Sequence, residues 1–133
     1  MILERTTKNI RKEAWKWFSR YIRFVRDQGV CYTCGKVQDP KEMDTGHYKH
    51  SAYLDFSEIN CHCQCVSCNR DLYGNPKVYR RKLVEEYGEG AIQMIEFMAK
   101  RIDVADEKLY YAVINIYKEL CRVDNNATSV IIG

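Results

Sequence analysis

Two short motifs, Cys31-Tyr-Thr-Cys34 and Cys65-Val-Ser-Cys68, decide the fold that we expect for this chain of 133 residues. Each C-x2-C pair can hold one side of a tetrahedral metal ion, and two pairs complete a shell of four thiolates. A closed shell leaves no open position for a substrate, so the sequence predicts a structural Zn²⁺ whose binding contributes to folding. The competing interpretations are unrelated reduced cysteines or a redox-active C-x2-C motif.

Two further cysteines stand next to the second pair, in the run Cys61-His-Cys-Gln-Cys65. If this run is a strand, its three cysteines face one side and His62 faces the other. We expect Cys61 and Cys63 to be small buried packing residues, although a ligand set that includes one of them stays open. Cys121 lies in a helical stretch and is expected in the core.

Composition and charge indicate one domain with a polyanion as partner. The 46% of hydrophobic residues allow a modest core, and a domain of this size gains from a bound metal. The net charge is +3, but residues 1–30 hold eight basic and three acidic side chains, which favours nucleic acid as the partner. No apolar run is long enough to span a bilayer and no signal peptide is visible, so we expect no membrane partner and reduced cysteines.

Periodicity and helix punctuation predict an α+β chain that is mainly helical, with a centre of short strands. Apolar residues at helical spacing indicate a basic amphipathic helix over 7–28, which Gly29 ends. Asn75 is expected as the N-cap and Pro76 as the first residue of a helix that stops at Gly88. The other segments expected in the single domain 1–133 are a zinc-stapled finger at 30–75, a helical extension at 76–123 with helices at 90–102 and 105–122, the last capped by Asp103 or Asp106, and a frayed tail at 124–133.

Four polar residues within and just after the segment between the C-x2-C pairs form the candidate catalytic group. His47 ends the run Asp44-Thr-Gly-His47, Asn60 comes five residues before the second pair, and Asn69 directly follows it. A histidine titrates near neutral pH and can take a proton from water. Carboxylate and amide oxygens suit a hard ion such as Mg²⁺ or Mn²⁺, which stabilises the charge of a phosphodiester transition state.

Phosphodiester hydrolysis gives each of these residues an expected role. His47 is the general base, Asn69 is a ligand of a catalytic Mg²⁺ or Mn²⁺, and Asp44 is the second ligand. Asn60 orients the loop of His47 through hydrogen bonds. Asp44 could instead miss the metal, which would leave Asn69 with water and substrate phosphate. Taken singly, these residues are also typical of turns and caps, and His50 is either another ligand or a surface histidine.

Four motifs follow one another along residues 14–97. They are Trp17-Phe-Ser-Arg-Tyr-Ile-Arg23 with Cys31-Tyr-Thr-Cys-Gly35, then Asp44-Thr-Gly-His-Tyr48, then Asn60-Cys-His62 with Gln64-Cys65 and Cys68-Asn69, then Gly74-Asn75 with Tyr79-Arg80, Leu83 and Tyr87-Gly88. Together they resemble the NinG/Rap family of phage recombination nucleases, within the HNH (His-Me finger) type in its His-Asn-Asn form. Gly46 departs from many HNH nucleases, which place a metal ligand directly before the histidine.

The resemblance implies a ββα-metal (HNH) finger stapled by zinc, with an N-terminal helix and appended C-terminal helices. It also implies a metal-dependent DNA endonuclease that acts on branched recombination intermediates, such as Holliday junctions and D-loops, in the cytoplasm of a bacterial host. His62 matches a family position and is expected either behind the metal ligands or against a phosphate. Junction cleavage favours paired active sites, so a homodimer through the helices after residue 90 is plausible.

Basic side chains supply the expected DNA contacts. Arg70 follows Asn69, and a further group starts the helix after Pro76, where a helix N-terminus favours phosphate. A stripe on the first helix, at spacings of four and three residues, is either a solvated face or a phosphate-tracking edge. The candidates for DNA binding are Arg70, Lys77, Arg80, Arg81, Lys16 and Arg20.

Two alternatives from other functional classes stay open. A non-catalytic zinc-stapled DNA-binding module would use the same basic surfaces but would not need His47, Asn60 and Asn69. A protein–protein adaptor built on a zinc ribbon would dock through the helices at 90–122 and would not show salt-dependent DNA binding.

Overall fold

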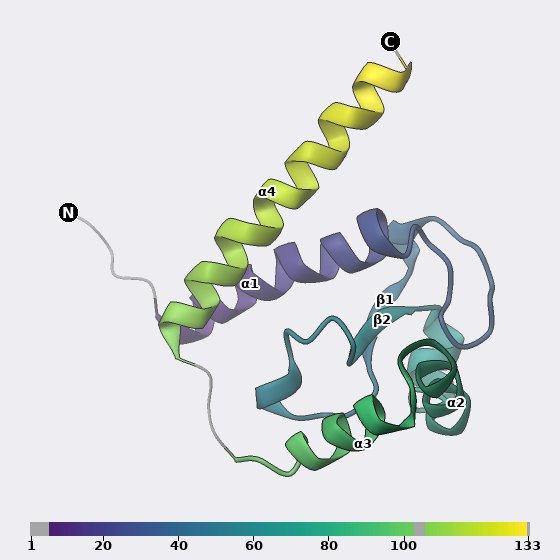
Figure 1. Cartoon of the computed structure of the whole chain (residues 1–133). Helices are drawn as coiled ribbons and strands as arrows, with labels where there is room; N and C mark the ends of the chain where they lie inside the picture. The colour runs from purple at the N-terminus through teal and green to yellow at the C-terminus, as the bar shows by residue number, and fades with distance from the viewer. Residues whose placement is uncertain (1–5, 103–105, 133) are drawn as a thin grey trace.

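A short antiparallel hairpin organises the computed structural model, which describes residues 6–102 and 106–132 (Figure 1). The elements are α1 (Thr7–Arg20), the π-helical turns η1 (Tyr21–Arg26), β1 (Asp44–His47), β2 (Cys61–Gln64), the π-helical turn η4 (Ser67–Asp71), α2 (Pro76–Tyr87), α3 (Glu89–Met98) and α4 (Glu107–Ile132), with 3-10 turns at Pro40–Glu42 and Ala52–Leu54. The mainly helical α+β class expected from the sequence is confirmed.

The hairpin alternates its side chains between two sets of neighbours, as the period of a strand requires. In its register Asp44 pairs with Gln64, and His47 pairs with Cys61. The Thr45 hydroxyl lies 2.8 Å from that of Ser19 on α1, whereas Asp44 contacts η4 through Asn69. The hairpin therefore lies between α1 and η4.

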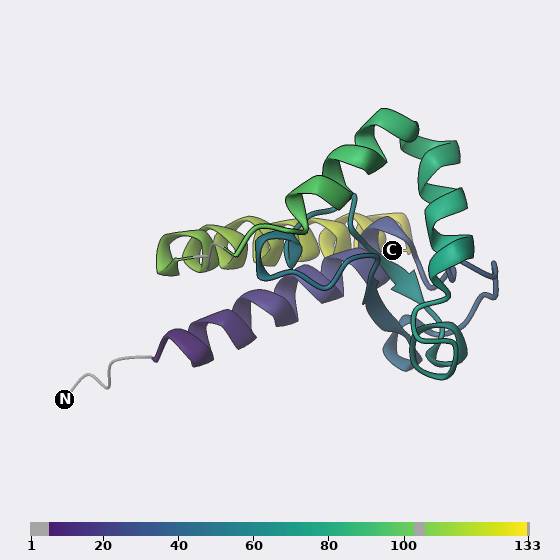
Figure 2. The ribbon, with the colours of Figure 1, turned by 90° about the horizontal axis from the view of Figure 1, so that it is seen from below.

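The larger core lies between α1 and α4, which run side by side (Figure 2). Ile10, Ala14 and Phe18 on α1 are buried against Tyr110 and Val113 on α4. The predicted first helix is confirmed in position, but its last part, Tyr21–Arg26, is a π-helix rather than an α-helix. Backbone hydrogen bonds there reach five residues back, such as that from the Asp27 amide to the Ile22 carbonyl at 2.9 Å.

A second, smaller core forms where α2 and α3 pack on the other side of the hairpin, around Tyr79, Leu83 and Ile92. Helix α2 begins at Pro76 and ends at Tyr87, as predicted, but Asn75 is not a side-chain N-cap. It has a φ of 50°, in the left-handed region that asparagine tolerates. Asn75 thus occupies the predicted N-cap position without a capping hydrogen bond from its side chain, and its amide nitrogen lies 4.0 Å from the Cys68 sulfur.

The last helix is longer than predicted. Of the two predicted capping residues, Asp106 caps the start of this helix, because its Oδ1 atom accepts a hydrogen bond from the Leu109 amide at 3.2 Å. The other, Asp103, lies outside the described residues. The tail expected to fray from residue 124 continues as helix to Ile132. Residues 107–132 contain no glycine or proline that would interrupt the helix. No helix in the described part of the chain is long and apolar enough to cross a membrane.

Candidate functional site

The two C-x2-C pairs come together as predicted. The sulfur atoms of Cys31, Cys34, Cys65 and Cys68 all lie within 4.8 Å of one another, an arrangement that could hold a structural metal such as zinc. The Cys68 backbone amide also points to the Cys65 sulfur, at 3.4 Å. Hydrogen bonds of this kind are typical of thiolates held around a metal ion.

The two cysteines that complicated the ligand assignment lie outside this group. The Cys61 thiol donates to the Asp55 carbonyl at 3.4 Å, and the Cys63 sulfur lies 3.6 Å from that of Met43. Both are fully buried, and burial raises the pKa of Cys63 to about 12. They are packing thiols, as expected.

Gln64 at the end of β2 ties the cysteine group to the hairpin. Its amide nitrogen donates to the Thr33 hydroxyl at 3.1 Å and to the Gly74 carbonyl at 2.9 Å. Its Oε1 atom is buried without a hydrogen-bond partner among the described residues and points at the backbone of Gly46. A metal held by the cysteines would therefore fix the position of the strand that carries the candidate catalytic residues.

Asp44 and Asn69, the two predicted ligands of a catalytic metal, are in contact. Asn69 Nδ2 donates to Asp44 Oδ2 at 2.9 Å. Arg70 donates to both carboxylate oxygens, each at 2.9 Å. Burial alone would raise the pKa of Asp44, but the hydrogen bonds from Arg70 and Asn69 outweigh burial and lower the pKa. A metal ion at this carboxylate would have to displace the exposed Arg70 side chain.

Gly46 directly precedes His47, and the structure leaves no room for a side chain there. A Cβ atom at this position would lie 1.8 Å from Gln64 Oε1 and 2.8 Å from Asn69 Oδ1. Residue 46 thus points at Asn69, so the candidate metal position lies on the side of β1 that Asp44 also faces.

His47 is held between an aromatic ring and a carboxylate. Its ring stacks on Trp15 of α1, with centroids 4.9 Å apart and an angle of 19° between the planes. Its Nε2 atom is enclosed and lies 3.6 Å from Asp55 Oδ1. Burial lowers the pKa of His47, and although the Asp55 carboxylate raises it in part, the net change is downward. The exposed His50 ring lies 5.9 Å away.

Asn60 spans the loop that follows β1. Its carbonyl oxygen accepts a hydrogen bond from the Lys49 amide at 2.9 Å. Its Nδ2 atom donates to the Lys49 carbonyl at 3.0 Å and to the Leu54 carbonyl at 3.3 Å. The side chain is completely buried, so all of its polar atoms serve the backbone next to His47 rather than a substrate.

His47 lies in one hollow of the surface, and the predicted metal ligands Asp44 and Asn69 lie in a neighbouring one. A cavity of about 360 Å³ is lined by His47, Asp55, Arg11 and Trp15. A groove of about 420 Å³ is lined by Asp44, Asn69, Arg70 and again Trp15. Trp15 therefore forms a shared wall between the candidate general base and the candidate metal ligands.

Comparison with known proteins identifies relatives of this sequence. A family model described as "Bacteriophage Lambda NinG protein" matches residues 4–126. This chain belongs to the NinG family. The resemblance to the NinG family seen in the sequence is thereby confirmed, and the match also covers parts of α1 and α4 that lie outside the motifs.

The NinG relatives are phage proteins. Protein ninG of Salmonella phage P22 is 38% identical over 94 residues, which cover 68% of this chain and 45% of that protein. Protein ninG of Escherichia phage lambda is 37% identical over 89 residues, which cover 64% of this chain and 43% of that protein. The chain thus spans less than half the length of these curated relatives. No solved structure matches it significantly.

His62, at a NinG motif position, lies in an aromatic cage. Its ring stacks on Tyr32 with centroids 3.8 Å apart. Its Nδ1 atom lies 3.3 Å from the Tyr79 hydroxyl, and its Nε2 atom 3.5 Å from that of Tyr87. Burial lowers the pKa of His62 to about 3. A buried, neutral ring cannot contact a DNA phosphate, so His62 supports the hairpin from behind.

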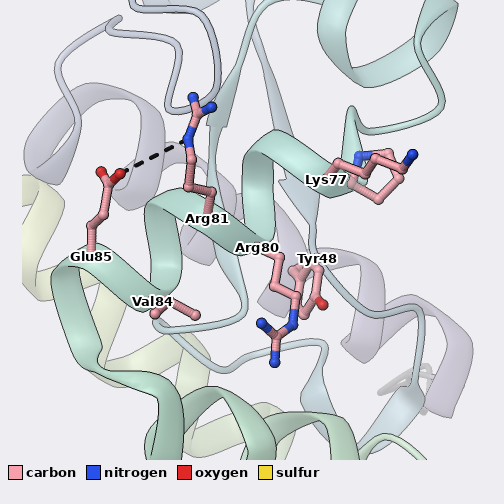
Figure 3. Close-up of a pocket in the computed structure, with 7 residues that line it drawn as sticks. Tyr48, Lys77, Arg80, Arg81, Val84 and Glu85 are labelled. Carbon is pink, nitrogen blue, oxygen red and sulfur yellow. Dashed lines mark ion pairs between the residues drawn. The ribbon is translucent and has the colours of Figure 1, made fainter.

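The basic residues predicted to bind DNA in this NinG chain differ in how far they are already paired. Arg80 is bound by Glu89 at 2.6 Å and by Glu96 at 3.1 Å, so its charge is compensated. Arg81 lies 3.9 Å from Glu85, at the edge of a hollow of about 570 Å³ that Lys77 also lines (Figure 3). Arg80 is therefore fixed structurally, whereas the weak surface pair of Arg81 is easily exchanged for a phosphate.

The two basic residues on α1 lie near aromatic rings. Lys16 Nζ is 5.0 Å from the centre of the Trp17 ring, and the Arg20 guanidinium is 4.7 Å from that of Phe24.

Sequence reasoning missed three residues of the His47 cavity, namely Trp15, Arg11 and Asp55. Trp15 and Arg11 occupy positions that are typical of any amphipathic helix, and Asp55 lies in a loop without a motif. The sequence therefore carried no signal for these three residues.

Proposed function

We propose that this NinG-family chain is a metal-dependent DNA endonuclease of the HNH type, with the β1–β2 hairpin and η4 as its ββα-metal finger. The observation that carries the proposal is the wall formed by Trp15. A neutral histidine lies on one side of it, and an acid–amide pair suited to a hard cation lies on the other. A general base and a site for a hard cation are the two components that this kind of phosphodiester hydrolysis needs.

His47 suits the part of a general base. Its lowered pKa keeps the imidazole neutral at pH 7, so that a ring nitrogen can accept a proton from water. The hydrogen bonds of Asn60 hold the following loop, and the stacked Trp15 holds the ring plane. The base would therefore meet its water in a fixed orientation, which lowers the entropic part of the barrier.

Asp44 and Asn69 offer the carboxylate and amide oxygens that Mg²⁺ or Mn²⁺ prefers. When bound, such an ion would supply positive charge to the phosphate oxygens and to the departing oxygen. The surrounding residues fit an ion once Arg70 turns away, because that side chain is 65% exposed and free to move toward solvent. Arg70 would then meet the DNA backbone, as the sequence predicts.

The proposed substrate is DNA, and within DNA the branched intermediates of recombination. Basic residues border both hollows, Lys8 and Lys12 of α1 at one and Arg23 of η1 at the other, and support a path for the phosphate backbone. The preference for junctions or D-loops, action in the bacterial host and a homodimer rest on the NinG family alone.

One observation favours a second candidate, the non-catalytic zinc-stapled DNA-binding module. Both oxygens of Asp44 are occupied by Arg70. If that pair persisted on DNA, the Asp44 carboxylate would not be available to a metal ion, and the chain would bind but not cut.

Cleavage of end-labelled DNA by the whole chain decides between the two. The substrates are a four-way junction and a linear duplex of the same sequence, with Mg²⁺ or Mn²⁺ and an EDTA control. We expect cleavage by the wild type, loss of at least about 100-fold in His47→Ala, and full activity in His50→Ala. Salt-dependent binding of both DNAs without cleavage by the wild type would refute the nuclease and favour the binding module.

A further inference from the structure

The carboxylate of Asp55 lies where a partner of His47 should be. Its Oδ1 atom is 3.6 Å from the enclosed Nε2 atom of His47. Its Oδ2 atom accepts a hydrogen bond from Arg11 Nη2 at 2.5 Å. The Asp55 side chain is only 15% exposed, whereas that of Arg11 is 53% exposed. One half-enclosed carboxylate thus connects the candidate general base to a cation at the surface.

The backbone around Asp55 is anchored, so its direction toward His47 follows from the fold. The Asp55 carbonyl accepts from the buried Cys61 thiol at 3.4 Å, and Cys61 pairs with His47 in the hairpin register. The next residue, Phe56, packs edge-on against Phe18, with ring centroids 5.6 Å apart. The hairpin and α1 together hold this loop against the imidazole.

We propose that Asp55 is a positioning residue for His47: its carboxylate accepts a hydrogen bond from Nε2–H, so that Nδ1 is the nitrogen that takes a proton from water. This assignment rests on the proposed nuclease function. The 3.6 Å separation is longer than a hydrogen bond, so the proposal requires the imidazole and the carboxylate to approach each other by roughly 0.5 Å. A carboxylate in this position fixes the tautomer and stabilises the imidazolium that forms when the base is protonated.

In the proposed nuclease, Arg11 connects the His47–Asp55 pair to a phosphate of the substrate. It shares the cavity with Lys8 and Lys12, so three cations border the space in front of His47. These three and the exposed His50 are the other charged or titratable groups near the ring, and Asp55 is the acid among the residues that line the cavity. A phosphate held by Arg11 would lie next to the carboxylate that orients the base.

Histidine NMR tests the coupling without any need for activity, because the chain has only three histidines. Ring ¹⁵N and ¹³C spectra of the whole metal-loaded protein are recorded from pH 8 to pH 4 for the wild type, Asp55→Asn, Asp55→Glu and the control Glu58→Gln. We expect His47 in the wild type to carry its proton on Nε2. In Asp55→Asn its pKa should fall, because a carboxylate that raises it has been removed.

Cleavage assays on the same variants complete the test. We expect Asp55→Asn to lose about tenfold or more in rate, with the acidic limb of its pH profile moved to lower pH, while Asp55→Glu recovers part of the rate. Glu58, which pairs with Arg26 and Tyr117 away from the cavity, should leave the rate and the His47 titration unchanged when it is altered. The same fall in rate in Glu58→Gln would point to a general loss of structure and would overturn the assignment.

Failure of this inference and failure of the nuclease proposal have different signatures. An unchanged His47 titration in Asp55→Asn, or a wild-type proton on Nδ1, overturns the role of Asp55 even if His47→Ala abolishes cleavage. A wild type that binds but does not cut DNA refutes the nuclease, whatever the spectra show, and with it the positioning role of Asp55.

Discussion

The acid sensitivity of the fold should depend on His62. Folding keeps this ring neutral, since burial lowers its pKa from the ordinary 6.5 to about 3. The unfolded chain takes up a proton as the pH falls through 6.5, so acid favours unfolding, and the stabilisation present above pH 6.5 is lost below it. From these two values, the free energy of unfolding should drop by about 2 kcal/mol between pH 7 and pH 5 through this one residue.

The substitution His62→Phe isolates this contribution. A phenyl ring keeps the stack on Tyr32 but cannot titrate, so the variant, whatever its stability at pH 7, should lose about 2 kcal/mol less on going to pH 5. Urea denaturation at both pH values measures the difference, and it cancels any loss of metal common to the two proteins. The exposed His50→Gln serves as the matched control. Equal pH dependence in the wild type and His62→Phe would refute a buried neutral His62.

Three further outcomes test the structure. Cys65→Ser should lose the bound metal and most of the folded population, whereas Cys63→Ser should keep one metal ion per chain, as measured by elemental analysis and circular dichroism; equal metal content would contradict the four-cysteine group. Gly46→Ala should destabilise the chain by about 1–3 kcal/mol in urea, because its Cβ would overlap Gln64, and an unchanged midpoint would show that Gln64 is not fixed there. Asn60→Ala should cost about 1–3 kcal/mol by leaving loop backbone groups unpaired, and faster hydrogen exchange at residues 49–54 should accompany it.

The sequence predicted best what spacing and punctuation determine. The four-cysteine group followed from two matched C-x2-C pairs, and the start of α2 from Pro76 and its end from Gly88. Asn75 stands at the N-cap position, as predicted, but no local pattern reveals that its side chain makes no capping hydrogen bond and lies 4.0 Å from the Cys68 sulfur. The π-helical turns Tyr21–Arg26 were equally invisible, since their apolar spacing also suits an α-helix.

Within the candidate site, sequence order revealed the residues of the hairpin but not their partners. Asp44 and Asn69 are 25 residues apart and were brought together by motif spacing alone. Asp55 comes from a loop and Arg11 and Trp15 come from α1, and only packing places them around His47. Charges that look available in a sequence can also be committed in the fold, as Arg80 is to Glu89 and Glu96.

The cysteine group closes a ring of chain between Cys34 and Cys65, which carries Asp44, His47 and Asn60. Loop-closure entropy grows only with the logarithm of length, so lengthening the 30 residues between these cysteines by ten costs about 0.3 kcal/mol. The closure of the ring would therefore oppose an insertion between the strands very little; what opposes one is the set of contacts that Asn60 and Asp55 make in the segment 48–59. The length of this ring is thus limited by the contacts around His47 and not by the cysteine group that closes it.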